Sequence, residues 1–331
     1  MDGENEAVIA PKSGRIDKVL AESLAVSRNQ IERLIGEGMV EIDGKTVRKN
    51  SLKVAEGDRI VYRFREAEKR KAPEIDFDVE ILYEDDAILV VNKPSGLVVH
   101  PAPSVKEATL VDWLIKKGIS LSTVSGEERH GIVHRIDKET TGALVVAKTN
   151  EAHRKLSEQL QDKSMGRYYL ALIDHPLKED TVVDQPIGRN PSNRLKMAVV
   201  PHGKAARTAF VKLVEGKHNI ELIAAKLYTG RTHQIRVHLQ SLGRHILGDD
   251  LYGFKSKKDT IARVQLHAYR LYMNHPLSGK TIEFTAPLFE DMKRIISNYF
   301  QYEEVERLID PDRIGRYFIV EGSTQQDDKR E

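Results

Sequence analysis

The chain of 331 residues is 40% hydrophobic, so it can build a sizeable core, and its length predicts two or more domains. It contains no cysteine, which excludes disulfides, thiol nucleophiles and cysteine-type zinc sites, and its formal net charge is only +2. The sequence has neither a signal-peptide pattern nor an apolar run long enough to span a bilayer, so we expect a cytoplasmic protein that does not bind membranes.

The amino-terminal region predicts a leader followed by two short helices. Residues 1–12 carry several acids and no periodicity, which is typical of a disordered leader. Apolar residues from Ile16 to Leu24 recur at helical spacing. Ser27 with Gln30 makes a capping box that opens a second helix.

A small sheet and a linker follow these helices. The pair Asp43-Gly44 predicts a tight hairpin, and a further strand runs from Arg59 to Phe64. We therefore expect a small αβ domain over residues 13–65. Residues 66–75 are charged and polar and contain a proline, so they read as the linker.

This first domain is more basic than the whole chain. From Ser13 to Lys71 there are fourteen Lys or Arg against ten Asp or Glu. The segment from Arg15 to Gly44 resembles the RNA-binding domain of the small-subunit ribosomal protein number four. The resemblance implies a scaffold that presents cations to RNA phosphates, whereas the alternative is an ordinary solvated face. The candidate RNA-binding side chains are Arg15, Arg28, Arg33, Lys45 and Arg48.

The second domain begins with two strands and a helix. A strand over residues 79–83 precedes the buried run 87–91, which ends in the loop Asn92-Lys93-Pro94-Ser95-Gly96. A helix over residues 109–115 contains Trp113, the single tryptophan, which we expect in the core.

A polar string then precedes a core strand. His134 to Gly142, HRIDKETTG, is followed at once by the apolar run 143–147, which predicts a buried strand. Packing alone does not require Arg135 and Asp137 there, because a carboxylate near a core needs a cationic or hydrogen-bonding partner to stay ionised. The plain alternative is a solvated turn with local caps.

The string HRIDKETTG resembles the signature of the RluA/RluD family of RNA pseudouridine synthases. The resemblance places the catalytic aspartate on Asp137. It also implies an α+β fold, with a mixed, mainly antiparallel sheet around a central catalytic cleft, over residues 76–300.

Later segments add further elements and motifs. Thr149 or Asn150 caps a helix, and residues 167–172 form a strand in which Tyr169, rather than Tyr168, matches the family's tyrosine. A hairpin spans residues 208–227. In the motif of residues 229–239, TGRTHQIRVHL, we expect Thr232 to cap a helix that ends before Gly243. A strand pair and a helix over residues 290–299 close the domain, and residues 301–331 form an extension with a disordered end.

The family resemblance also implies roles for individual residues. Asp137, Tyr169 and Arg236 are the catalytic candidates, with Arg236 pairing to Asp137 and Arg135 distorting the RNA as the uridine flips. The resemblance further implies no cofactor, no metal and a monomer whose partner is large-subunit rRNA, free or in pre-ribosomal particles. The remaining candidates for binding RNA or uridine are His134, Ile235, Lys93, His100, Thr141 and Arg231.

Four other interpretations compete with this one. They are a transfer-RNA enzyme, a catalytically silent RNA-binding assembly factor, a glycoside hydrolase using Asp137 with Glu139, and a metal site on His233 and His238. The two histidines are five residues apart, which does not place two ligands on one helical face, so we expect structural histidines. The sequence leaves open which uridines are modified and whether Asp137 acts as nucleophile or as base.

Overall fold

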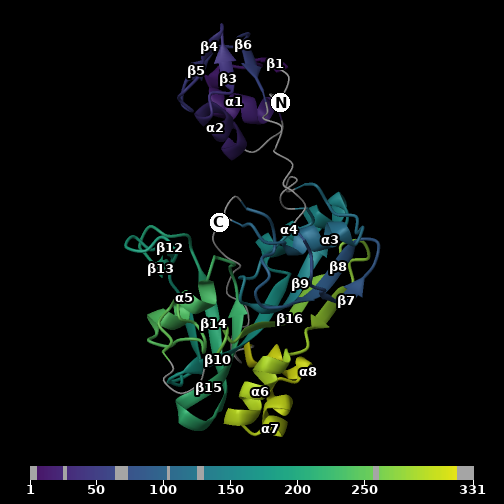
Figure 1. The fold of residues 1–331 in the computed structure, drawn as a ribbon, viewed down its shortest axis with the longest axis vertical. Helices are drawn as coiled ribbons and strands as arrows, with labels where there is room; N and C mark the ends of the chain where they lie inside the picture. The colour runs from purple at the N-terminus through teal and green to yellow at the C-terminus, as the bar shows by residue number, and fades with distance from the viewer. Residues whose placement is uncertain are drawn as a thin grey trace, which may run out of the picture. The chain divides into compact units, whose positions relative to one another are not determined.

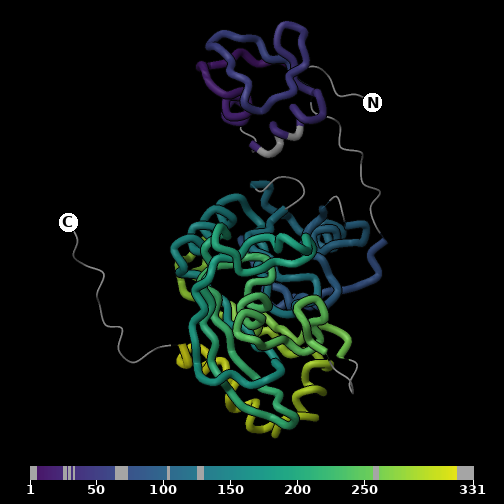
Figure 2. Tube along the Cα trace, turned by 90° about the vertical axis from the view of Figure 1, so that its left-hand side faces the viewer, coloured from purple at the N-terminus to yellow at the C-terminus, as the bar shows by residue number. Residues whose placement is uncertain are grey.

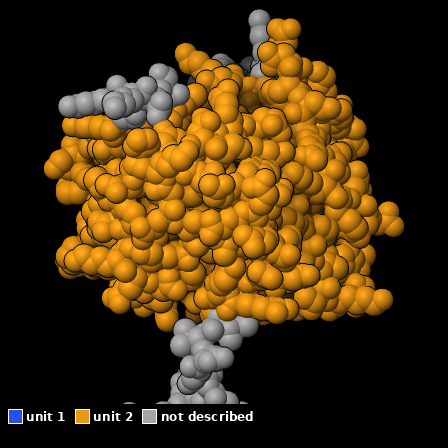
Figure 3. Space-filling model, turned by 90° about the horizontal axis from the view of Figure 1, so that it is seen from below, with its two compact units in different colours: residues 1–71 blue, residues 72–331 orange. Residues whose placement is uncertain are grey.

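The computed structural model describes residues 6–24, 28–63, 74–102, 105–124, 130–255 and 261–318, without the side chains of residues 29, 30 and 33. The chain divides into two compact units, Met1–Lys71 and Ala72–Glu331 (Figure 1). Figure 3 shows one face of the second unit, in orange. Most of the predicted linker, and Ser27 of the predicted capping box, lie outside the described residues. Within the described part no helix is long and apolar enough to span a membrane.

The first unit packs two helices against small sheets (Figure 1). Its main sheet has the strand order β1-β6-β3-β4, and β2 pairs with β5. Fully buried side chains such as Ile16, Ile31 and Ile60 join helices and sheet in one core, because each apolar helical face needs a partner. The elements are β1 (Glu6–Ile9), β2 (Gly14–Arg15), α1 (Ile16–Ser23), α2 (Arg28–Gly36), β3 (Val40–Ile42), β4 (Lys45–Thr46), β5 (Lys53–Val54) and β6 (Arg59–Tyr62).

The predicted disordered leader over residues 1–12 is wrong for its described part. Residues 6–9 form β1, which pairs antiparallel with β6 from Glu6 opposite Tyr62 to Ile9 opposite Arg59. The side chains of β1 are largely exposed, so the strand has no alternation to reveal it. It forms because β6 offers unpaired backbone groups at its edge, which is a long-range condition.

The second unit is built on a nine-stranded sheet, and the α+β prediction is confirmed. The strand order is β11-β14-β15-β10-β16-β9-β8-β7, with β17 pairing β16. Every pair in this sheet is antiparallel except β9 with β16. A separate hairpin, β12 with β13, precedes β14. The strands are β7 (Glu80–Glu84), β8 (Ile88–Lys93), β9 (Thr141–Ala147), β10 (Gly166–Asp174), β11 (Thr181–Asp184), β12 (Ile187–Arg189), β13 (Met197–Val199), β14 (Arg207–Glu215), β15 (Ile220–Leu227), β16 (Leu266–Asn274) and β17 (Thr281–Thr285).

Helices cover both faces of the sheet, because successive side chains of each strand point to opposite sides. In β8, Leu89 and Val91 pack on the face covered by α3 and α5, whereas Ile88 and Val90 pack with α4. Trp113 of α3 is only 2% exposed, which confirms its predicted place in the core. The helices of this unit are α3 (Leu110–Lys116), α4 (Asn150–Asp162), α5 (Gln234–Ser241), α6 (Glu290–Tyr299), α7 (Tyr302–Leu308) and α8 (Pro311–Ile314), with short 3-10 helices at Lys217–Asn219 and Arg316–Phe318.

The segment after residue 300 belongs to the second unit. Val305 and Ile314 join the core cluster of α6 and β10, and Phe318 stacks on Tyr168 with ring centroids 5.3 Å apart. Figure 2 shows this segment, in yellow, beside the green trace of the same unit. The extension therefore covers the sheet face opposite α3 and α5. Residues 319–331, where the sequence predicts disorder, lie outside the described part.

Candidate active site

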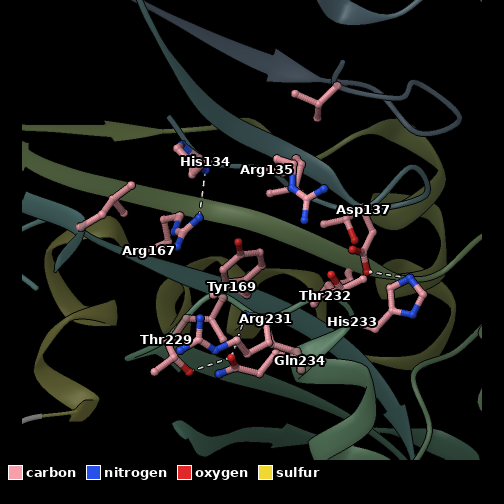
Figure 4. Close-up of a pocket in the computed structure, with 18 of the residues that line it drawn as sticks. His134, Arg135, Asp137, Arg167, Tyr169, Thr229, Arg231, Thr232, His233 and Gln234 are labelled. Carbon is pink, nitrogen blue, oxygen red and sulfur yellow. Dashed lines mark hydrogen bonds and ion pairs between the residues drawn. The ribbon is translucent and has the colours of Figure 1, made fainter. Parts of the chain in front are cut away.

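A cavity of about 640 Å³ lies beside β10 and the start of α5 (Figure 4). This volume is typical of pockets that hold small ligands. Among the described residues that line it, only Asp137 is acidic, so the cavity is suited to an anionic partner. The basic side chains of its wall are Arg135, Lys138, Lys163, Arg167, Lys226, Arg231 and Arg236.

Asp137 belongs to an ion-pair network with Arg236 and Asp249. Nη1 of Arg236 lies 3.3 Å from Oδ2 of Asp137, while Nε and Nη2 of Arg236 donate to the two carboxylate oxygens of Asp249 at 2.7 and 2.8 Å. Burial alone would lower the pKa of Arg236, but the hydrogen bonds to Asp249 and the charges of both aspartates raise it. Asp137 lines the cavity, and its Oδ1 accepts no hydrogen bond from any described residue, so one carboxylate oxygen is held by Arg236 and the other is free.

His233 approaches the same carboxylate from a second side. Its Nε2 lies 3.9 Å from Oδ2 of Asp137, and its Nδ1 lies 2.8 Å from the hydroxyl of Tyr252. That hydroxyl accepts a hydrogen bond from the backbone N of Met197 at 2.8 Å, so its own hydrogen is free to donate to Nδ1. We therefore assign the ring proton to Nε2, facing Asp137.

Burial shifts the pKa of both partners in this contact. Burial lowers the pKa of His233, although Asp137 opposes the shift, and burial raises the pKa of Tyr252 to about 12. Both groups are therefore neutral near pH 7, which is consistent with the assigned tautomer.

Tyr169 and Arg167 face the cavity from β10, while Tyr168 packs in the core cluster on the other face of the strand. Tyr169 is 3% exposed, and burial raises the pKa of its phenol. Nη1 of Arg167 donates to Nδ1 of His134 at 2.9 Å (Figure 4). Burial lowers the pKa of His134 well below its usual value, so a neutral imidazole accepts this bond.

Lys93 lies elsewhere than expected. The sequence places it at the rim of the site, yet its side chain is fully buried and does not line the cavity. Its ammonium donates to the carbonyl oxygens of Pro94, Leu97 and Lys138 at 2.7, 2.8 and 3.0 Å. Burial lowers the pKa of Lys93 to about 7. The three acceptors favour the ammonium, because only the charged form has three donors, so Lys93 fixes the loop that carries Asp137.

Thr141 is likewise buried behind the site rather than in it. Its hydroxyl lies 2.8 Å from Nδ1 of His267, and it lines a second, smaller cavity together with Glu139. The other five RNA- or uridine-binding candidates of the second unit, His100, His134, Arg135, Arg231 and Ile235, do line the main cavity. Of these, Ile235 is 3% exposed, whereas the side chains of Arg135 and Arg231 are exposed.

The start of α5 differs from the predicted cap. The N-cap residue is His233, in the left-handed region at φ 56°, and it makes no capping hydrogen bond. Instead Oε1 of Gln234 accepts from the backbone N of Arg231 at 3.0 Å and from the hydroxyl of Thr229 at 2.7 Å. The prediction that Thr232 caps this helix is therefore wrong. This turn and the start of α5 place His233 and Arg236 beside Asp137.

Known proteins resemble this chain over most of its length. A family model described as RNA pseudouridylate synthase matches residues 87–241. A Helicobacter pylori protein named "Uncharacterized RNA pseudouridine synthase" is 45% identical over 315 residues, which span 92% of this chain and 96% of that protein. The chain belongs to the RNA pseudouridine synthase family. It is therefore an isomerase that acts on RNA.

Further relatives and solved structures extend the comparison. The "Ribosomal large subunit pseudouridine synthase D" of Nitrosomonas europaea is 40% identical over 85% of this chain and 83% of its own length. The solved structure of "Human RNA Pseudouridylate Synthase Domain Containing 1" covers 68% of the enzyme and 96% of its own chain, with a TM-score of 0.52 and 24% identity. This last likeness shows the shared fold.

A family model described as S4 domain matches residues 14–60 of the first unit. The candidate RNA-binding side chains of this unit differ in their surroundings. The guanidinium groups of Arg15 and Arg28 both bind the buried carboxylate of Asp17, at 2.8 and 2.6 Å to Oδ2. Burial opposes ionisation of Asp17, but the two arginines lower its pKa. The side chains of Lys45 and Arg48 are exposed, and that of Arg33 lies outside the described part.

Three residues of the site escaped sequence analysis. The sequence alone does not single out Asp249 or Tyr252, and it predicts a structural role for His233. The string Gly248 to Gly253, with its paired acids and tyrosine between glycines, was the available signal. His238, by contrast, binds the hydroxyl of Thr208 at 2.8 Å, as expected of a structural histidine. Among the described residues no cluster of three or more His, Asp or Glu could hold a metal ion.

Proposed function

We propose that the enzyme converts specific uridines of large-subunit rRNA to pseudouridine, with Asp137 as the essential carboxylate. The observation that carries the role of Asp137 is its isolation as the acidic group of a basic cavity, with one oxygen held by Arg236 and the other free. The rRNA target is supported by relatives about 40% identical that are named for the ribosomal large subunit. Transfer RNA is the second candidate substrate.

The reaction needs a carboxylate at the sugar. The bond between C1′ and N1 of uracil breaks, the base turns, C5 bonds to C1′, and C5 loses a hydrogen while N1 gains one. Positive charge develops on the ribose as the first bond breaks, and an ionised carboxylate stabilises it, as nucleophile or as electrostatic partner. In this scheme Oδ1 of Asp137 meets the sugar, and Arg236 and His233 hold Oδ2 in place.

Tyr169 and Ile235 are proposed to contact the uracil. Both are almost fully buried at the cavity wall, so they offer apolar surface to a base that has left its stack. The raised pKa of Tyr169 keeps its phenol protonated near neutral pH, so its hydroxyl can hydrogen-bond the base and relay the proton that leaves C5.

Arg135 is proposed to support base flipping. Extruding a uridine from a helix costs a few kcal/mol of stacking and pairing. The Arg135 side chain is exposed at the cavity that holds Asp137, so it can enter the gap left in the RNA. The first unit is proposed to hold RNA phosphates through Arg15, Arg28 and Lys45. We further propose that the enzyme acts as a monomer in the cytoplasm.

The test is pseudouridine mapping by reverse transcription after chemical labelling of total RNA. Cells lacking the protein should lose one or a few sites in large-subunit rRNA, and a plasmid copy should restore them. Asp137→Asn should bind the same RNA with near-normal affinity but restore no site. Full restoration by Asp137→Asn would refute the role of this carboxylate.

The matched control is Glu139→Gln, which removes the neighbouring charge. Oε2 of Glu139 accepts from Ser95 at 3.0 Å and faces the second cavity, so this variant should remain active. A glycoside hydrolase using the two acids would lose activity with either substitution. If no RNA gains pseudouridine from the wild-type protein, the silent RNA-binding alternative is favoured instead.

A further inference from the structure

A row of alternating aromatic and cationic side chains lies at one end of three neighbouring strands. It is near the start of β10, the end of β15 and the start of β14. The ammonium of Lys226 lies 5.6 Å from the ring centroid of Tyr168 and 5.3 Å from that of Tyr228. The guanidinium carbon of Arg207 lies 5.1 Å from the ring centroid of Tyr228. We name these four residues the cation–aromatic row.

The row continues into the wall of the active-site cavity. Lys226 and Tyr228 both line that cavity. The backbone of Arg207 donates to the hydroxyl of Thr229 at 2.9 Å, and its carbonyl accepts from Nε2 of Gln234 at 3.0 Å. The same segment carries His233 to Asp137, so the row is fixed relative to the catalytic carboxylate.

The two cations of the row lack acidic partners within the described residues. Neither Lys226 nor Arg207 forms an ion pair with a carboxylate, and Asp184, opposite Arg207 on β11, makes none with it. Lys155 on α4, by comparison, pairs with Glu151 at 2.8 Å. Aromatic rings orient a cation without cancelling its charge, so the row keeps two charges available to an anion.

The aromatic rings also reduce the entropic cost of binding an anion. A free lysine or arginine loses substantial rotamer freedom when it holds a ligand, and a side chain already fixed by packing loses less. Burial lowers the pKa of Lys226, so an anion beside the ammonium would favour its charged form.

We propose that the cation–aromatic row binds the phosphodiester backbone of the RNA strand as it leaves the cavity on one side of the target uridine. This inference rests on the proposed function, because it takes the strand in the cavity to carry that uridine. Both cations lie over the Tyr228 ring, so the row offers charge rather than an open stacking surface. Phosphate contacts of this kind position RNA without reading its sequence.

The experiment measures the affinity of the full-length enzyme for an RNA fragment that contains a mapped uridine, as salt is varied. Each phosphate contact to a single strand contributes about 0.7 to the slope of log K against log salt. Lys226→Gln and Arg207→Gln should each bind more weakly at low salt. Their deficit against wild type should shrink roughly 2- to 3-fold between about 50 and 200 mM salt for each lost contact. The KM for RNA should rise while kcat at saturating RNA stays unchanged.

Matched variants separate charge from packing. Lys226→Arg should keep the wild-type slope, and Lys155→Gln, which removes a paired lysine on α4, should change neither slope nor KM. Tyr228→Phe keeps the ring and should bind normally, whereas Tyr228→Leu releases both cations and should weaken binding. Arg207 is exposed, so its variant tests the proposal even if a change at Lys226 impairs folding.

The outcomes distinguish this inference from the proposed function. Wild-type slope and KM in both Gln variants, with pseudouridine still formed by the wild-type enzyme, would overturn the row and leave the proposed function intact. A shallower salt dependence in both variants would support the row as an RNA contact, even if the mapped RNA belonged to another class. Equal weakening by Lys155→Gln would attribute the effect to net charge and also overturn the proposal.

Discussion

Asp249 offers a sharp test of how Asp137, the proposed catalytic carboxylate, is held. Its side chain is 1% exposed, and both its oxygens accept hydrogen bonds from Arg236, whose side chain is 7% exposed. Asp249→Asn keeps the shape of the side chain but removes its charge and one acceptor. The guanidinium of Arg236 then keeps one hydrogen bond to the remaining amide oxygen, the 3.3 Å contact to Asp137 and the ring of Tyr252, 4.8 Å from its centroid.

The expected loss of folding stability follows from the free-energy cost of leaving a buried charge without its partner. Removing one member of a buried ion pair typically costs about 3–5 kcal/mol. Because Asp137 remains near Arg236, we expect the lower end, about 3 kcal/mol. At about 2–4 °C per kcal/mol for a domain of this size, the melting temperature of the second unit should fall by roughly 6–12 °C. The value of kcat should fall as well, since Arg236 no longer has a fixed position beside Asp137.

Fluorescence of Trp113 provides the assay. It is the single tryptophan, it is buried in the second unit, and its Nε1 donates to Asp78 at 3.0 Å, so its emission reports unfolding of that unit. Asp250→Asn is the matched control, because Asp250 is the exposed neighbour and should melt within about 0.5 kcal/mol of wild type. Equal melting temperatures for the two variants would refute the reasoning.

A double variant separates stability from catalysis. Replacing both members of a buried ion pair by apolar residues is often neutral or stabilising. Asp249→Leu with Arg236→Met should therefore recover much of the lost melting temperature while pseudouridine formation stays low. Recovery of activity along with stability would show that Arg236 is not needed to position Asp137.

Three further predictions concern other contacts. His233→Gln retains an amide donor toward Asp137 and should keep more of kcat than His233→Asn, with RNA affinity unchanged in both; equal kcat values would contradict the assigned tautomer. Lys93→Met leaves three buried carbonyls without a donor, so the melting temperature should fall well below that of wild type, and an unchanged value would show that water replaces the ammonium. Because the pKa of Asp17 is lowered on folding, its contribution to stability is present above about pH 3.9 and is lost as pH falls through the folded value. Carbon-13 NMR of the full chain should show the lowered pKa of Asp17, and Arg28→Gln should raise that pKa toward its usual value. A normal pKa of Asp17 in the wild-type protein would contradict this contribution to stability.

Local sequence determined most elements of the second unit. The helix predicted over residues 290–299 matches α6, and the apolar run 143–147 lies within β9. The string HRIDKETTG placed Asp137 in front of that strand. These features rest on periodicity, turn residues and fixed local motifs, which need only neighbours along the chain.

Tertiary structure alone decided which side chains meet. Arg236 lies 99 residues after Asp137, and Asp249 joins them through a turn that gave no helical or strand pattern. Whether Lys93 is exposed or buried depends on the loop that folds over it, and β1 forms only because β6 offers its edge. Burial and long-range pairing are properties of the packed molecule, so the sequence supplied the groups and the fold set their distances.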